Sequence, residues 1–406
     1  MPTGLFNTDP ARVPANLVAN SFASAIAHLM PNGEATLFAM TSMLSTETAV
    51  QIEHGFFTKT MVFPSVTLNG SVTSSDTTIT VVTTENMIPG MLLRFEDAAA
   101  YEIVIVNNVV STTQLQVQRG LGGVSAASHS DATKAYQVGS AHEEGSARPN
   151  ALNIKAVRIT NLTHIFRDSW AVTDTMRATM MIAGANNVAD SRKECMTFHA
   201  CNIERGIIFS QKSQGTRNGQ PFRTMDGFIS IVGNLAYYPS SYSAANVFVA
   251  GSTTNYTQLE AMIDPCFNQT TDPKTANERL ILTGSTGKKV LTKIGRLSGQ
   301  YQIMDGQNSY GLQFGTFKVS RGTCRIVEHP MLNSNPTWAQ MALVVDMSTF
   351  NLAYLGNRKT MPEEAMAPDN DGHDSEVGSL TTEMTITIKN PPANAVIYNL
   401  TDGAAG

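Results

Sequence analysis

The spacing of apolar residues changes several times along this chain, and each change marks a different kind of predicted element. Near the N-terminus, apolar residues recur at helical spacing over residues 17–29 and again over residues 34–44. Pro and Gly separate the two runs, so the pattern predicts two short helices after an irregular start. Residues 46–63 then follow an extended pattern, which Pro64 closes.

The clearest change lies within residues 65–139, where β-branched segments replace helical spacing. The strongest segments are DTTITV at 76–81, EIVIV at 102–106 and TQLQVQ at 113–118. Polar and apolar residues alternate in the first and last of these, so one face of a sheet is expected to be buried and the other wetted. The pattern predicts a small β barrel or sandwich. Because helical patterns flank it on both sides, it is interpreted as a module inserted into a host domain.

After residue 139 the host pattern resumes. Residues 153–165 are extended, and we expect them to pair with residues 46–63 as the arms of one hairpin whose tip holds the β module. Residues 186–212 then repeat apolar positions on one helical face, which predicts a single helix of roughly 40 Å. The expected apolar face contains Val188, Met196, Ile203 and Ile207.

Length and charge limit the possible functions. With 406 residues the chain is longer than one ordinary domain, which favours two compact units or one domain with an insertion. Only 15% of the residues are charged, against an average near ~25%. An uncharged polar surface suits packing against neighbours, because charged groups are depleted from interface centres. The net charge of −5 argues against a protein that grips phosphates through a basic face.

Cysteine usage and terminal signals favour neither export nor redox chemistry. The four cysteines are Cys195, Cys201, Cys266 and Cys324. No Cys-x-x-Cys pair occurs among them, so we expect reduced structural thiols and no zinc site. Residues 1–20 lack a basic start with an apolar run, and no apolar stretch approaches the ~18 residues of a membrane helix. We expect a protein that stays in the cytoplasm where it is made and has no membrane partner.

Two glycine-rich segments match nucleotide-binding loops only in part. Residues 284–289, GSTGKK, have a shorter spacing than a P-loop and lack the Ser or Thr that would follow the lysine to hold magnesium. We therefore expect a surface turn there. Residues 119–123, RGLGG, lack the strand-to-helix context of a dinucleotide loop, so their glycines are expected to form a tight turn between strands.

Acidic residues and histidines also fall short of a site. The acidic group nearest the C-terminus is Asp369, Asp371, Asp374 and Glu376. Its spacing misses the EF-hand pattern, so a solvated acidic loop is expected. His142, beside Glu143 and Glu144, has no second histidine at metal-ligand spacing. His164 and His199 stand alone and are expected to be hydrogen-bonded within the fold. We predict no catalytic residue, no metal, no cofactor and no enzymatic activity.

A series of motifs in the middle of the chain carries the strongest functional signal. In order they are NLTHIFR at 161–167, VTDT at 172–175, the charged helix at 186–212, and RTMDG at 223–227. Together they resemble the major head proteins of tailed bacteriophages. In that family an extended segment leads through a turn into one long charged helix, and a loop follows.

The C-terminal third extends this resemblance. Residues 314–327 and 341–355 look like the returning strands of that family. The family's Gly-Asp-Ser type turn, the Glu of its terminal strand, its Asn and its apolar tail correspond to Gly372, Asp374, Ser375, Glu383, Asn390 and residues 395–400. His373, inserted within the turn, departs from the family pattern.

The resemblance implies an α+β architecture, the Hong Kong ninety-seven type phage capsid fold, with an all-β insertion domain. The implied parts are an N-terminal arm with its helices (1–45), an extended loop hairpin (46–64 and 140–180), an inserted small β barrel or sandwich (65–139), a peripheral domain (181–229 and 314–406) with a spine helix (186–212), and an axial domain (230–313).

The same resemblance implies a function. It is that of a major capsid protein which self-assembles into hexamers and pentamers of an icosahedral phage head enclosing double-stranded DNA. The implied partners are further copies of the chain, a portal, a scaffolding protein, a decoration protein, and packaged DNA bound without sequence specificity. The protein is expected in the virion shell, assembled in the host cytoplasm.

Charged residues concentrate on the predicted hairpin and long helix of an otherwise charge-poor chain. Because the extended elements of such a subunit reach its neighbours, we predict intersubunit ion pairs there. The proposed contacts are Glu143, Glu144, Arg148, Arg167, Asp168, Arg192 and Glu204.

Two other classes of protein are compatible with parts of the sequence. A virion attachment or carbohydrate-binding protein would use the Thr-rich β module and the aromatic residues Tyr237, Tyr238 and Tyr242. Fibre proteins show repeats or long β stretches, whereas this chain has one long helix and no visible repeat. A polysaccharide-cleaving enzyme would need paired carboxylates in one cleft, which the sequence does not place.

Overall fold

The computed structural model describes most of the chain between residues 46 and 403. The described ranges are 46–59, 64–97, 102–149, 156–179, 187–239, 242, 244–269, 277–297, 308–309, 312–313, 315–365 and 375–403. The chain forms two compact units, Phe57–Arg158 and a second made of Met1–Phe56 with Ile159–Gly406. The two short helices expected at 17–29 and 34–44 lie outside the described residues.

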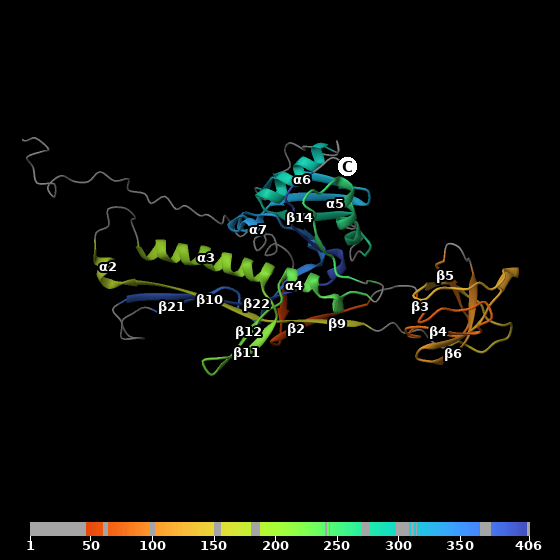
Figure 1. The fold of residues 1–406 in the computed structure, drawn as a ribbon. Helices are drawn as coiled ribbons and strands as arrows, with labels where there is room; N and C mark the ends of the chain where they lie inside the picture. Colours follow the sequence, from red (N-terminus) through yellow and green to blue (C-terminus); the bar gives the residue numbers. More distant parts are fainter. Residues whose placement is uncertain are drawn as a thin grey trace, which may run out of the picture. The chain divides into compact units, whose positions relative to one another are not determined.

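The unit Phe57–Arg158 is built around one antiparallel sheet of six strands, drawn in orange to yellow in Figure 1. Their order is β3 (Ser65–Thr67), β8 (Lys134–Ser140), β5 (Met91–Phe95), β6 (Ile103–Ser111), β7 (Gln114–Gln118) and β4 (Thr78–Thr80). In β7, Leu115 and Val117 are buried while the three glutamines are exposed. The predicted alternation is therefore correct for this strand, and its apolar side joins one continuous core.

The glycine-rich segment after β7 is the tight turn that the sequence predicts. It contains the 3-10 turn η2 (Leu121–Gly123), and Gly120, Gly122 and Gly123 have φ values of 73°, 69° and 79°. These left-handed conformations are nearly free of strain only for glycine.

The larger unit contains a five-stranded sheet made from distant parts of the chain (Figure 1). The strands run in the order β1 (Thr46–Ala49), β20 (Phe350–Leu355), β22 (Ser375–Ile388) and β10 (His164–Thr173), and β21 (Met361–Ala365) also pairs with β22. β1 is parallel to β20, and the other pairs are antiparallel.

This sheet corrects the extent of the predicted hairpin at 46–64 and 140–180. Among the described residues of these ranges, β2 (Glu53–Thr58) and β9 (Val157–Leu162) pair with each other, whereas β1 and β10 belong to the five-stranded sheet. The reason is burial. Phe166, Trp170 and Val172 on one side of β10 are each at most 8% exposed, and a free two-stranded arm could not cover them.

A second sheet of six strands corrects the predicted boundary between axial and peripheral parts at residue 313. Its order is β13 (Val247–Val249), β23 (Ala395–Tyr398), β19 (Ala342–Val345), β14 (Glu278–Thr283), β18 (Gly322–Glu328) and β17 (Gly315–Val319). Four strands that the prediction assigned to the peripheral domain thus share a sheet with β13 and β14. β14 is buried from Arg279 to Thr283, so it needs a neighbour on each edge, and β18 and β19 supply them.

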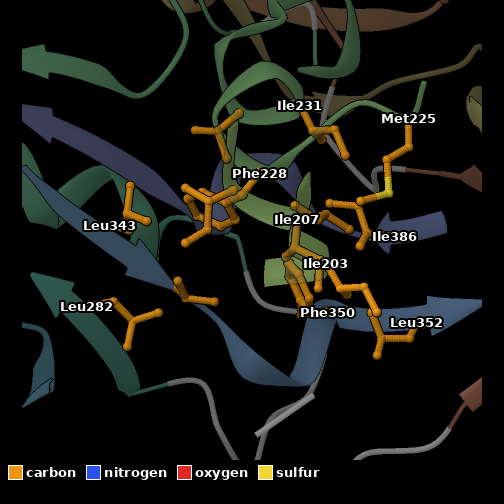
Figure 2. Packing of buried hydrophobic residues seen from close by; sticks show 14 of the residues in the cluster. Ile203, Ile207, Met225, Phe228, Ile231, Leu282, Leu343, Phe350, Leu352 and Ile386 are labelled. Carbon is orange, nitrogen blue, oxygen red and sulfur yellow. The ribbon is translucent and has the colours of Figure 1, made fainter. Parts of the chain in front are cut away.

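The two faces of this sheet carry two separate cores. Leu280 and Leu282 of β14 pack with α3 (Asn187–Phe209) and α4 (Phe228–Gly233), and Figure 2 shows part of this cluster. Ile281 points to the opposite face and packs with α5 (Tyr256–Ile263) and α6 (Ser285–Leu297). The period of two along a strand separates these cores.

Helix α3 is the predicted long helix, with 23 residues and a length of roughly 35 Å. It ends at Phe209, earlier than residue 212, because Lys212 donates its amide to Asp226 Oδ1 at 2.8 Å as the chain turns into the hairpin of β11 (Ser213–Arg217) and β12 (Gln220–Thr224). Ile203 and Ile207 are buried as predicted, but Met196 is 52% exposed and was wrongly placed on the buried face. Cys195 and His199 occupy the two preceding turns of that face instead.

The surface turn predicted at 284–289 is wrong. β14 ends at Thr283 and helix α6 begins at Ser285, so Gly284 is the whole connection. A Cβ on Gly284 would lie 2.5 Å from Ala339 Cα, which explains why a glycine stands at this close approach. Because glycines interrupt the apolar spacing of α6, the sequence pattern does not predict a helix here. The apolar face of the helix packs through Val290, Leu291 and Ile294.

Short elements complete the described part of the larger unit. They are α2 (Asp174–Ala178), β11 (Ser213–Arg217), β12 (Gln220–Thr224), η3 (Leu235–Tyr237), η4 (Asp264–Phe267), β15 (Asn308–Ser309), β16 (Leu312–Gln313), η5 (Pro330–Ser334), α7 (Pro336–Ala339), η6 (Met347–Thr349) and η7 (Pro391–Ala393). β11 and β12 form a hairpin whose two-residue loop, Asn218-Gly219, has φ values of 52° and 75°, as a type I′ turn requires.

Candidate functional site

Three of the predicted contact residues lie in the unit Phe57–Arg158. Glu143, Glu144 and Arg148 follow β8, and all three are exposed. None of them forms an ion pair with another residue in the described part of the chain. Their charges are therefore presented outward from this unit.

Two further predicted residues are exposed on the larger unit. Arg167 lies on β10, where the outward residues alternate with the buried Phe166. Arg192 lies in the second turn of α3 and is exposed. Both side chains are placed where a neighbouring molecule can reach them.

The remaining two predicted residues, Asp168 and Glu204, make contacts inside the subunit. Asp168 Oδ2 lies 2.7 Å from His199 Nδ1, and Asn202 Nδ2 donates to Asp168 Oδ1 at 2.9 Å. Glu204 is 1% exposed, and its Oε1 lies 2.5 Å from Nε2 of the buried His329. The buried Glu204 carboxylate is closed off from a neighbouring molecule, whereas the Asp168 side chain keeps 25% of its surface exposed.

These internal pairs connect α3 to neighbouring elements at two positions along the helix, His199 and Glu204. His199 also lies with Nε2 2.7 Å from Thr382 Oγ1, so one ring connects the helix to both β10 and β22. One turn further along, Glu204 connects the helix to the segment just before η5 through His329. The lone His199 is hydrogen-bonded within the fold, as the sequence analysis expects.

The centre of polar contacts in the larger unit is Glu383, which is completely buried in β22. Its Oε1 accepts hydrogen bonds from the Arg223 guanidinium and, at 3.0 Å, from Thr163 Oγ1. Arg223 Nε also donates to Thr163 Oγ1 at 2.9 Å, and Arg358 Nη1 lies 3.0 Å from Glu383 Oε2. One carboxylate thus holds together β12, β22, the β9–β10 junction and the chain after β20.

An amide performs a similar task beside it. Asn161, at the end of β9, donates Nδ2 to the carbonyl oxygens of Asp226 and Ile386, each at 3.0 Å. Its Oδ1 accepts the Asp226 amide at 2.7 Å. Asp226 Oδ1 in turn accepts from Ser230 Oγ at 2.6 Å, at the start of α4. The root of the β2–β9 pair is therefore anchored to both α4 and β22.

The resemblance motifs contain these anchors, although the sequence analysis did not assign them a role. Asn161, Arg223, Asp226 and Glu383 each lie in a motif that was matched by its order along the chain. The contact between Arg223 and Glu383 joins residues 160 positions apart. Motif spacing could single out the residues, but only the fold shows that they meet.

The second sheet has its own buried ion pair. Arg279 Nη1 lies 3.6 Å from Asp346 Oδ2, and both side chains are at most 3% exposed. The guanidinium also donates to the carbonyl oxygens of Ala393 and Cys266 and lies 4.8 Å from the ring centre of Phe267. These contacts satisfy a charge that would otherwise be costly to bury.

The comparison with known proteins decides what this architecture belongs to. The family model described as SU10 major capsid protein matches residues 1–401. The chain belongs to the SU10 major capsid protein family. A curated relative, the major capsid protein of Pseudomonas phage PaMx41, is 34% identical over 412 residues, covering 98% of this chain and 96% of the relative.

The solved capsid of cyanophage A-1(L) is similar to this SU10-family protein in fold. The likeness has a TM-score of 0.51 at 11% identity and covers 96% of this chain and 99% of that one. The predicted Hong Kong ninety-seven type capsid fold, with α3 as its spine helix, is confirmed. That residues 65–139 are an insertion into this fold stays a prediction.

Other chemistry is limited in the described part of this SU10-family protein. No group of three or more His, Cys, Asp or Glu side chains there could hold a metal ion. Cys195, Cys266 and Cys324 are buried free thiols, and burial raises the pKa of Cys324 to about 12. Of the acidic group at 369–376, only Glu376 lies among the described residues. The helices searched include none long and apolar enough to cross a membrane.

Proposed function

We propose that this SU10-family major capsid protein assembles into hexamers and pentamers of an icosahedral phage head that encloses double-stranded DNA. The observation that carries the proposal is the family match over residues 1–401, supported by the capsid fold. The protein acts as a building unit, so its task is to make many contacts and no catalytic site is invoked.

Exposed apolar side chains support an assembled state. Phe198 and Met196 on α3 are 68% and 52% exposed, and Val249 on the sheet-edge strand β13 is 70% exposed. Leaving large apolar groups in water is unfavourable by roughly 25 cal/mol per Å². Many modest contacts of this kind, closed into a shell, stabilise one another collectively.

Ion pairs between subunits are the second part of the proposal. The candidates are Glu143, Glu144, Arg148, Arg167 and Arg192, which are all exposed. Asp168 and Glu204 are left out because their carboxylates are bound inside the subunit. Single exposed pairs contribute little, so these contacts would set the register of assembly more than its strength.

The partners follow from the same role. We infer that a portal, a scaffolding protein and a decoration protein join the shell, that assembly takes place in the host cytoplasm, and that DNA is enclosed without sequence-specific contacts. Co-purification of particles with the neighbouring gene products would test each of these partners separately.

The experiment that tests the main proposal is negative-stain electron microscopy of the full chain, expressed alone and with its neighbouring gene products. Closed shells, tubes or rings of capsomers are the expected result. Monomers or trimers in both preparations would contradict the proposal and favour the attachment protein instead.

A further inference from the structure

Helix α6 carries positive charge on the side that faces away from its sheet. Val290, Leu291 and Ile294 on the inner side pack into the sheet's apolar core. The cations are Lys288, Lys289, Lys293 and Arg296, and the last three are spaced three or four positions apart, which places them on one side of the helix. No acidic residue occurs in Ser285–Leu297.

A hollow of about 650 Å³ lies along this side of the helix. Its walls include Lys288, Lys289, Thr292, Lys293, Arg296 and Glu328. We call this feature the α6 basic hollow. It is an open hollow in which four cationic side chains share one wall.

The charges of the α6 basic hollow are only partly balanced. Lys288 Nζ lies 3.3 Å from Glu328 Oε2, and Lys293 Nζ lies 2.6 Å from Asp402 Oδ1. Among the residues that the structure describes, no carboxylate pairs with Lys289 or Arg296. A chain with a net charge of −5 therefore concentrates uncompensated positive charge at one place.

The start of α6 is already occupied, so the attraction for an anion comes from the side chains. Asn333 Oδ1 accepts the Ser285 amide at 2.6 Å, which satisfies one of the free donors at the helix end. Lys288, the lysine nearest a P-loop position, is directed to Glu328. This arrangement differs from a nucleotide loop despite its strand–glycine–helix context.

We propose that the α6 basic hollow binds the phosphate backbone of double-stranded DNA inside the shell, an inference that rests on the proposed function of enclosing DNA. Lysine and arginine neutralise phosphates without reading sequence. Lys289, Lys293 and Arg296 recur about every 5 Å along the helix axis, and a duplex carries a charge per ~1.7 Å of its own axis, so contact with phosphates needs no fixed register.

The composition of the hollow favours duplex DNA over other polyanions. No aromatic side chain lines it, so it offers no platform on which unpaired bases could stack. Its only large apolar member is Leu297, whereas the cores of protein interfaces are rich in aromatic residues and poor in lysine. An acidic segment of a neighbouring subunit therefore fits the hollow less well than a phosphate backbone.

The net charge of the chain is compatible with a local basic surface. A total of −5 describes the chain as an average and says nothing about how cations are placed. The apolar period of α6 gathers the basic residues on one side, because the opposite side is needed for the core.

The test compares two triple variants of the full chain with equal charge change. One is Lys289→Gln, Lys293→Gln and Arg296→Gln, and the other replaces the exposed Lys134, Arg217 and Lys318 with glutamine. Binding of a short fluorescent DNA duplex is titrated at several salt concentrations, with two unrelated duplex sequences. Thermal melting confirms that both variants are folded.

The α6 variant is expected to lose at least tenfold in affinity at low salt for both sequences. The slope of log K against log salt should fall by about 2 to 3, since each lost phosphate contact removes ~0.9. The control variant should keep the original slope. Equal losses in the two variants, or an unchanged slope in the α6 variant, would overturn the proposal.

Electron microscopy of the same proteins separates this proposal from the proposed function. If the α6 variant alone stops forming particles while its duplex binding is unchanged, the hollow is a subunit contact and the DNA proposal is wrong. If the unmodified chain and its gene-neighbour mixtures form no particles, the shell proposal fails, whatever the duplex titration shows.

Discussion

At the scale of single residues, the larger unit contains buried charges that are satisfied by hydrogen bonds and ion pairs to neighbouring side chains. Glu383 is fully buried and faces two arginines and a threonine hydroxyl. Burying such a carboxylate is tolerable only because its partners are in place, and removing one of them leaves an uncompensated charge. Loss of this carboxylate would therefore leave buried cationic groups unpaired and release contacts to the segments that it joins.

We predict that Glu383→Gln lowers the free energy of unfolding by about 3 kcal/mol, because Arg223, only 13% exposed, loses its counter-charge in a buried site. Urea unfolding followed by circular dichroism measures the change. Glu278→Gln is the matched control, since its pair with Arg325 at 3.1 Å is roughly half exposed and should matter by less than about 1 kcal/mol. Equal effects of the two substitutions would show that Glu383 is not an anchor.

The β unit has its own titratable anchor in Glu102. The carboxylate is buried, and Arg119 donates to it from Nε at 3.0 Å and from Nη2 at 2.6 Å. His129 Nε2 lies 3.2 Å away, and the Ala127 amide donates at 3.1 Å. Burial alone would raise the pKa of Glu102, but these hydrogen bonds outweigh it and lower the pKa from 4.5 to about 2.

A pH dependence follows from this lowered pKa. Because the folded value lies below the unfolded value, the stabilisation is complete above pH 4.5 and is lost as the pH falls towards about 2. Calorimetry of the full chain should show a transition whose midpoint falls across this window. Glu102→Gln should lower that midpoint at neutral pH and flatten its acid dependence, whereas Glu144→Gln, on the surface of the same unit, should leave both unchanged.

At the scale of elements, the packing of α3 against β10 depends on a helix position without a side chain. A Cβ on Gly206 would lie 2.5 Å from Phe166 Cζ and 2.8 Å from its Cε1. Phe166 is 7% exposed and stacks on His164 at 4.1 Å between ring centres, so it has little room to move. A glycine in mid-helix is normally unfavourable, and here the close approach explains it.

We therefore predict that Gly206→Ala destabilises the protein by about 1–2 kcal/mol. Overpacking costs roughly 1–3 kcal/mol, which exceeds the ~1 kcal/mol that alanine gains in helix propensity. In a double-mutant cycle with Phe166→Leu, the smaller leucine side chain should leave room for the added Cβ. The double variant should therefore lose less stability than the sum of the two single variants, which gives a measurable coupling energy. A Gly206→Ala protein more stable than the original would mean that the two elements can separate without cost.

The type of an element was easier to predict from sequence than which side of a helix is buried or which strand a given strand pairs with. The long helix and the β-rich segment follow from periodicity, which is a local property. Met196 was misplaced because the true inward row of α3 contains His199, a polar residue that breaks the apolar pattern and is buried only because Asp168 and Thr382 satisfy it. The start of α6 was missed because Gly284 and Gly287 match a turn in composition while serving close packing.

At the scale of the whole molecule, family motifs gave the fold, whereas the assembly surfaces required the structure. Exposure separates the seven predicted contact residues into two classes, since Glu204 is 1% exposed and Glu144 lies in the open. Nothing in the local sequence distinguishes these two glutamates. What decides is whether a distant residue, here His329, comes within reach when the chain folds.

The last prediction concerns assembly through the exposed charges. Reversing Glu144 to Lys should leave the subunit folded, because its side chain has no ion-pair partner in the described part of the chain, yet it should reduce the yield of closed particles severalfold. Like charges placed opposite each other repel at a contact, and reversing the true partner should restore attraction. A second reversal, Arg167→Glu or Arg192→Glu, is therefore expected to recover particles in one of the two combinations.

Particle yield is counted by electron microscopy, with Glu85→Lys as the matched reversal on the same unit. Normal yields for Glu144→Lys, or losses that neither second reversal repairs, would remove these residues from the proposed interface.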